Sequence, residues 1–152
     1  MQINSEILVR LVPEILEKSA MMLAEPLRDP PLSIDSPLIE AQISFSGHAN
    51  GDLTLLCPES FCLLAAASML GLDEDELVQA QAEDVLAELT NVLCGQLLTA
   101  IAGTTPVFKL SMPNILRRED FEWPTFAALP EFIAFEAEGH PLLVKITMQE
   151  SV

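Results

Sequence analysis

Hydrophobic positions recur along the chain with two different periods, one typical of helices and one typical of strands. A helical spacing begins at Ser5 and continues to about residue 23, and the same spacing returns over 59–70 and from about 81 to 103. Alternation of apolar and polar residues predicts strands over 38–46, 106–113 and the two halves of 131–149, and residues 52–57 are expected to form a fifth strand that returns from a hairpin loop. We therefore expect three main helices and about five strands.

The segments between these elements carry turn signals. Residues 25–37 contain four prolines and two aspartates and predict a loop, and residues 47–51 (GHANG) predict a five-residue hairpin loop. The segment 114–130 follows no regular period and is expected to be irregular. Because hairpin connections favour antiparallel pairing, the predicted fold class is α+β. We expect an antiparallel β-sheet of about five strands packed against three main helices, in one domain over residues 1–152.

Acidic residues narrow the classes of partner that the chain can bind. It has 23 Asp and Glu residues against 7 Lys and Arg residues, a formal net charge of −16. This charge repels phosphate backbones and anionic membrane surfaces, so we expect no nucleic acid and no membrane among the partners. The longest apolar stretch, 61–70, is shorter than the ~20 residues that cross a bilayer, and no secretory signal pattern is present. The expected location is the cytoplasm.

The cysteines and histidines do not predict a metal site. Cys57, Cys62 and Cys94 form no CxxC pair and stand among apolar residues, which indicates buried thiols. His48 and His140 each stand beside a glycine in an expected turn, so we interpret both as turn residues and expect no Ser-His-Asp triad. We therefore expect no metal ligands in the chain.

The segment EDVLAELTNVLCGQLLTA, residues 83–100, combines an apolar helix face with an unusual polar one. At about 100° per residue, Asp84, Glu88, Asn91 and Gly95 share a stripe roughly 60° wide. The opposite side of the helix carries Leu86, Leu89, Leu93, Leu97 and Ala100. We expect this second side to face the core and the four-residue stripe to be exposed.

Within the stripe, Glu88 and Asn91 can act on one small volume, because residues three apart on a helix have Cβ atoms about 5–6 Å apart. Exposed helix faces carry Glu and Asn routinely, so a solvated face is the simpler interpretation of the pair. Gly95 favours a functional one, since a glycine inside a helix costs about 1 kcal/mol relative to alanine and indicates packing or the close approach of another group. The stripe is therefore a candidate functional site.

Three features of the chain occur together: the Asp-x3-Glu-x2-Asn-x3-Gly stripe on a long helix, the downstream LSMP that ends at Pro113, and the upstream hairpin ISFSGHANGDLTLLCP. Together they resemble the CheX/CheC family of chemotaxis phosphatases over about residues 40–148. The N-terminal helix has no second Glu-x-x-Asn, so the chain is similar to the one-centre CheX type and not to the two-centre CheC type. The resemblance implies a CheC/CheX-like fold and permits a homodimer that pairs through the sheets.

Members of that family dephosphorylate the receiver protein CheY at an aspartyl phosphate, and the resemblance implies the same activity in chemotaxis or related two-component signalling. It implies that Asn91 positions the attacking water and that Glu88 pairs with a lysine of the receiver. These two are the expected catalytic residues, and Glu88, Asp84 and Gly95 are the expected partner-binding residues. Asp84 and Thr90 are expected to be rim contacts or solvated positions without a chemical role. The phosphorylated receiver would supply Mg²⁺, and the chain itself would hold no cofactor.

Two other interpretations stay open. A non-catalytic CheC-like interaction module would dock a receiver or a flagellar-switch partner without hydrolysing anything. The presence of both Glu88 and Asn91 favours catalysis, because binding alone would tolerate glutamine or serine at position 91. The second alternative is an unrelated α+β scaffold that carries a Glu-x-x-Asn by chance.

Overall fold

The computed structural model describes residues 5–150, and that part of the chain contains four α-helices and seven β-strands. The helices are α1 (Ser5–Ala20), α2 (Glu59–Leu70), α3 (Gln79–Ala102) and α4 (Trp123–Ala127), with short 3-10 turns at Glu74–Glu76 and Asp120–Glu122. The strands are β1 (Ala24–Pro26), β2 (Leu38–Gly47), β3 (Ala49–Pro58), β4 (Phe108–Leu110), β5 (Asn114–Arg118), β6 (Ile133–Ala137) and β7 (His140–Glu150).

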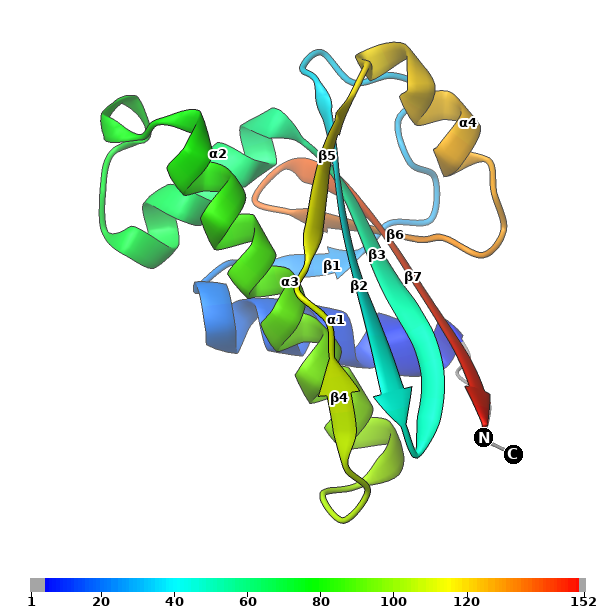
Figure 1. Cartoon of the computed structure of the whole chain (residues 1–152). Helices are drawn as coiled ribbons and strands as arrows, with labels where there is room; N and C mark the ends of the chain where they lie inside the picture. The colour runs from blue at the N-terminus through cyan, green and yellow to red at the C-terminus, as the bar shows by residue number, and fades with distance from the viewer. Residues whose placement is uncertain (1–4, 151–152) are drawn as a thin grey trace.

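All seven strands join one antiparallel sheet. Their order is β1-β6-β7-β3-β2-β4, and β5 follows β4 along the same edge of β2. The predicted α+β class with an antiparallel sheet is confirmed, and the sheet has two more strands than the five expected. Figure 1 shows α1, α2 and α3 on one side of this sheet and α4 on the other.

Two segments that were expected to be irregular contain regular elements. β1 overlaps the start of the Pro-rich segment 25–37 and pairs with β6. The segment 114–130 forms β5, which pairs with β2, and then α4. Conversely, the strand expected over 106–113 is regular only in β4. These short elements depend on pairing with distant strands, and such partners leave no periodic signal within the segment itself.

The hairpin between β2 and β3 is tighter than the predicted five-residue loop over 47–51. The two strands continue until only His48 separates them. Gly47 adopts a φ of 124°, a backbone conformation that favours glycine, at this turn. Gly51 lies inside β3, where a Cβ atom would be 1.9 Å from the backbone oxygen of Thr147. The glycine at 51 is therefore needed for the close approach of β7 and not for a turn.

The main hydrophobic core lies between the sheet and the three long helices. From α3 it takes the side chains that the helical period predicts, Leu86, Leu89, Leu93 and Leu97. Ala100, expected on the same side, is exposed in the last turn of α3, which extends beyond α1 in Figure 1. By length and composition alone α3 could cross a membrane, a test that the core helix of a soluble protein also passes.

A smaller hydrophobic cluster lies on the opposite face of the sheet. Its buried members are Leu38, Leu56, Trp123, Phe132 and Leu143. The side chain of Trp123, at the start of α4, is fully buried, and its indole Nε1–H donates a hydrogen bond to the carbonyl oxygen of Pro31 at 2.9 Å. The loop before β2 and the helix after β5 thus cover this second face together.

Candidate active site

The four residues of the stripe lie on the side of α3 that faces away from the core. Asp84 and Glu88 are exposed, and Asn91 and Gly95 are half-buried. The leucines on the opposite side of the helix are fixed in the main core, so the backbone that carries the stripe is held by packing along its length. The helix has 24 residues and is about 36 Å long, which makes it a rigid platform.

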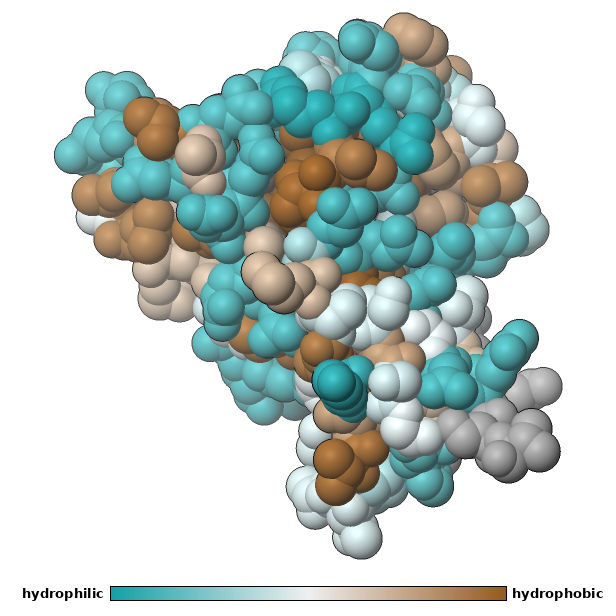
Figure 2. All heavy atoms as spheres, in the orientation of Figure 1, coloured by the Kyte–Doolittle hydropathy of each residue, from teal (hydrophilic) through white to brown (hydrophobic). Residues whose placement is uncertain are grey.

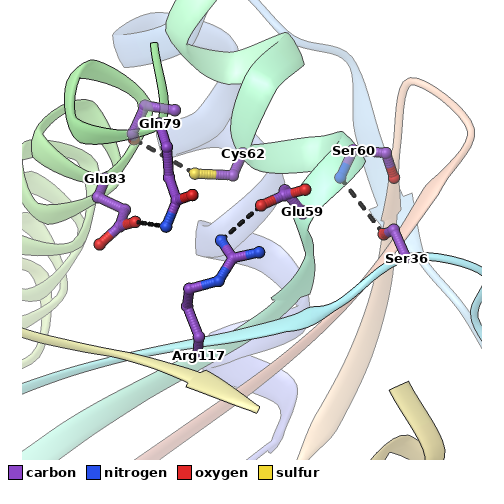
Figure 3. A network of polar contacts seen from close by, with 8 residues as sticks. Ser36, Glu59, Ser60, Cys62, Gln79, Glu83 and Arg117 are labelled. Carbon is purple, nitrogen blue, oxygen red and sulfur yellow. Dashed lines mark hydrogen bonds and ion pairs between the residues drawn. The ribbon is translucent and has the colours of Figure 1, made fainter. Parts of the chain in front are cut away.

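Polar contacts also tie the N-terminal end of α3 and the neighbouring strand β5 to α2 (Figure 3). The Sγ–H group of Cys62 in α2 donates to the carbonyl oxygen of Ala82, with an S···O distance of 3.2 Å. Arg117 of β5 forms an ion pair with Glu59, the first residue of α2. The first contact holds the start of α3 against α2, two residues before Asp84, and the second holds β5 against the same helix.

Glu88 and Asn91 have no partner within the described chain. Over residues 5–150, neither side chain makes a hydrogen bond or an ion pair. In contrast, Glu40 pairs with Arg118, and Glu59 pairs with Arg117. The carboxylate of Glu88 and the carboxamide one helical turn away are therefore free to bind groups of another molecule.

Thr90 does not lie at the rim of the site. It is fully buried, and its hydroxyl donates to the carbonyl oxygen of Leu86 at 2.7 Å. The expectation that Thr90 is a rim contact or a solvated position is therefore wrong. The reason is angular, because position 90 lies about 120° around the helix from the stripe, on the side that packs against the core.

The fold of the chain itself does not require a glycine at position 95. A Cβ atom there would have only Leu110 Cδ1 as a neighbour, at 4.0 Å, which is an ordinary van der Waals distance. Alanine at this position would stabilise the helix by about 1 kcal/mol. Gly95 therefore leaves space that a second molecule can use, at a cost in stability to the chain.

The LSMP segment approaches the stripe at its first residue. Leu110, the last residue of β4, is the one residue outside α3 with an atom within 4 Å of a Cβ placed on Gly95. Beyond it, the backbone N–H of Ser111 donates to the oxygen of Ser44 at 2.8 Å, and Ser111 Oγ accepts the N–H of Ser44 at 2.9 Å. The side chain of Met112 is 90% exposed. The motif was visible in the sequence, but its position against Gly95 depends on the pairing with β2.

The histidines occupy other parts of the fold. His48 lies in the turn between β2 and β3, edge-on to the ring of Phe108. His140 begins β7, and its Nδ1 is 3.2 Å from the Oγ of Ser60. Within residues 5–150, no group of three His, Cys, Asp or Glu side chains is arranged to hold a metal ion.

The three cysteines are free and buried, as predicted. Burial raises the pKa of Cys62 and of Cys94 to about 12, and it raises the pKa of Cys57 well above its ordinary value. Because a thiol reacts as its thiolate, we expect iodoacetamide at pH 8 to label the native protein about 10³-fold more slowly than an ordinary thiol. Mass spectrometry would follow the labelling, with the urea-unfolded chain as the fast control. Rapid labelling of the folded protein would contradict this expectation.

One antiparallel sheet covered on one face by three helices is the architecture of CheC-like and CheX-like chemotaxis proteins. The structure resembles CheX from Vibrio vulnificus with a TM-score of 0.70 and 15% identity, over 98% of this chain and 100% of that chain. It resembles a CheC-like superfamily protein from a Shewanella species with a TM-score of 0.69 and 17% identity, over 97% of this chain and 99% of that one. The crystallised CheX–CheY–BeF3–Mg²⁺ complex from Borrelia burgdorferi also matches, with a TM-score of 0.64 and 16% identity, over 98% and 100% of the two chains.

The family model described as chemotaxis phosphatase CheX matches residues 39–134, well over half of the chain. The chain therefore belongs to the CheX family of chemotaxis phosphatases. The matched region includes the hairpin of β2 and β3, the whole of α3 and the LSMP segment. No curated protein sequence matches the chain.

Proposed function

We propose that the protein is a phosphatase that hydrolyses the aspartyl phosphate of a CheY-like receiver domain, in chemotaxis or a related two-component pathway. One observation carries the proposal. Glu88 and Asn91 lie one turn apart on an exposed helix face, without a partner in residues 5–150, inside the region that matches the CheX family model. A carboxylate and a carboxamide placed in this way can complete an active site whose other groups belong to a second protein.

In this proposal Asn91 positions the attacking water. An acyl phosphate is already activated and reacts through a loose transition state, so the main requirement is a water held in line with the leaving oxygen. The carboxamide oxygen of Asn91 can accept a hydrogen bond from that water, while its NH₂ group donates to a phosphoryl oxygen. A strong general base is not needed for this step.

Glu88 is proposed to anchor the receiver. Its free carboxylate would pair with a lysine near the phosphorylated aspartate of the receiver, and this charged hydrogen bond would fix the direction of Asn91. Asp84, one turn before it, adds negative charge on the same side of the helix, and Gly95 leaves room for the surface of the partner. The net charge of −16 favours a partner with a cationic patch at this place.

The receiver is proposed to bring Mg²⁺ with it, and the Borrelia burgdorferi complex holds CheY together with BeF3 and Mg²⁺. The chain would contribute no cofactor of its own and would act in the cytoplasm. A homodimer stays part of the proposal. Residues 145–149 of β7 pair with β3 but, in the described part of the chain, with no strand on their other side, which leaves an edge where a second sheet could pair.

The proposal is tested by following the decay of phosphate on a cognate receiver. Catalytic amounts of the protein should accelerate this decay for at least one receiver of the organism. Glu88→Gln keeps the size of the side chain and removes its charge, so it should raise the receiver concentration needed for half-maximal rate about tenfold or more, with a smaller change in maximal rate. The concentration dependence of the initial rate measures both quantities.

Two outcomes would contradict the phosphatase proposal. Binding of the receiver without faster decay would identify the non-catalytic interaction module, an alternative that the likeness to a CheC-like superfamily protein keeps in view. Neither binding nor faster decay with any receiver of the organism would exclude both functions.

A further inference from the structure

A hollow of about 380 Å³ lies beside Gly95, beyond Asn91 toward the C-terminal end of α3. α3 forms one wall, and the segment that leads into β4 forms the other. The lining residues are Gly95, Leu98, Thr99, Gly103, Thr104, Pro106, Phe108 and Leu110. Four of these residues are apolar and the other four are glycine or threonine, and the volume is large enough for a single large side chain of a partner.

The hollow is uncharged in a strongly acidic protein. None of its lining residues is ionisable, although the whole chain carries a net charge of −16. The exposed side of α3 is thus divided, with Asp84 and Glu88 toward its N-terminal end and an uncharged hollow toward its C-terminal end. A partner that matches this side presents a cationic group and an uncharged group in the same order.

Two exposed apolar residues are close in sequence to residues that line the hollow. Val107, between two lining residues, is 81% exposed, and Met112, two residues after Leu110, is 90% exposed. Figure 2 shows hydrophobic atoms at the surface near the lower end of the molecule, where β4 begins in Figure 1. Exposed apolar side chains in the segment that lines a neutral hollow are typical of a protein interface.

We propose that this hollow receives an apolar side chain of the receiver domain while Asn91 faces the phosphoryl group. This inference rests on the proposed phosphatase function and assigns the receiver a direction on α3. Its lysine lies toward the Glu88 end, and its apolar anchor lies toward Leu98, seven residues and about 10 Å further along the helix from Asn91.

Geometry selects the receiver as the occupant. A standard interface buries about 800 Å² on each partner, which corresponds to a disc with a radius of roughly 16 Å. Since the hollow begins about 6 Å from Asn91, at Gly95, and extends past Leu98 on the same side of the helix, a receiver whose phosphoaspartate reaches Asn91 also covers the hollow. A covered, uncharged hollow favours an apolar side chain and opposes a charged one.

The test compares two variants, each of which carries one new negative charge in the last turns of α3. Thr99→Asp puts a carboxylate at the rim of the hollow, and Ala100→Asp puts the same charge on the next residue, which is exposed and turned about 100° away. Thr99 is exposed, and its hydroxyl donates only within the helix, to the oxygen of Gly95 at 3.0 Å. Both variants should therefore fold. Thr99→Val has nearly the shape of threonine and removes the polar group.

Calorimetry would measure the affinity of each variant for the receiver loaded with beryllium fluoride and Mg²⁺. We expect Thr99→Asp to weaken binding about tenfold or more, Ala100→Asp to leave it nearly unchanged, and Thr99→Val to keep or increase it. The rate at saturating phosphorylated receiver should change much less than the affinity.

Three outcomes would overturn the inference. Equal affinities of Thr99→Asp and Ala100→Asp, with a wild type that still accelerates phosphate decay, would reject the anchor and keep the phosphatase. Thr99→Asp could instead leave the receiver affinity unchanged and lower the mass of the protein in the absence of receiver, measured by light scattering. That result would show that a second copy of the chain covers the hollow. A wild type that neither binds nor dephosphorylates any receiver would remove the proposed function and the anchor with it.

Discussion

Asn91→Ala is expected to abolish most of the acceleration of receiver dephosphorylation and to leave receiver binding nearly unchanged. The substitution removes the group that would hold the attacking water and keeps Glu88, the proposed anchor. Misplacing a reacting group by about 1 Å can cost 10²-fold in rate, so removing its holder should lower the maximal rate about 10²-fold or more. Decay of phosphorylated receiver measures the rate, and calorimetry with the beryllium-fluoride form measures the binding.

Loss of folding would not explain such a result. Asn91 is half-buried and has no hydrogen-bond partner over residues 5–150, and alanine is the better helix former by about 0.7 kcal/mol. The Asn91→Ala variant should therefore be as stable as the wild type or slightly more stable. Thermal unfolding of both proteins checks this point.

Two further substitutions at the same position test the chemistry. Asn91→Gln keeps the carboxamide but moves it by one methylene, so it should recover only part of the rate. Asn91→Asp keeps the length but replaces the donor NH₂ group with a negative charge beside the phosphoryl oxygens, so it should be as slow as alanine. If Asn91→Ala accelerates decay as well as the wild type does, Asn91 does not position the water.

The helix that carries the site was predictable from the sequence because its signal is local. Leu86, Leu89, Leu93 and Leu97 repeat with the helical period and are all buried, and the same period predicts that Asp84 and Glu88 are exposed. The helical period also places Thr90 on the buried side, but it wrongly places Ala100 there. Whether such positions are buried depends on which other element lies against them, and a helical period does not contain that information.

The uncharged hollow was not predictable in this way, since it forms between two segments. Leu98 belongs to α3, whereas Phe108 and Leu110 belong to β4, and the distance between them depends on how β4 pairs with β2. Gly95 was the one local signal, as a glycine inside a helix without a turn to explain it. It indicated that something approaches the helix there, but not the chemistry of the approaching group.

The opposite face of the sheet was missed for a related reason. The segment 114–130 is charged and aperiodic, yet Arg118 in it pairs with Glu40 and Glu122 and lies 5.3 Å from the centre of the Phe126 ring. The hydrogen bond with Glu40 raises the pKa of the arginine further above its ordinary value. The contact with the distant Glu40 and the pairing of β5 with β2 therefore help to order a segment whose own pattern predicts no structure.

Trp123→Ala is expected to give the largest loss of stability among single changes on that face. The indole is fully buried in the small cluster with Leu38 and Leu56, and its Nε1–H is bonded to the oxygen of Pro31. Truncating a buried tryptophan costs about 3–5 kcal/mol, a large part of the 5–15 kcal/mol that typically stabilises a domain. For a chain of this size the midpoint of thermal unfolding should fall by about 6–20 °C.

The catalytic rate should nevertheless survive in the Trp123→Ala variant at low temperature, because the sheet separates Trp123 from the helix layer that carries Asn91. Phe121→Ala is the matched control, since Phe121 is an aromatic residue two positions earlier in the same segment and is 73% exposed. It should change the free energy of unfolding by no more than about 0.5 kcal/mol. Equal stability losses in the two variants would show that α4 does not bury its tryptophan against the sheet. A loss of rate in fully folded Trp123→Ala protein would show that the two faces of the sheet are coupled.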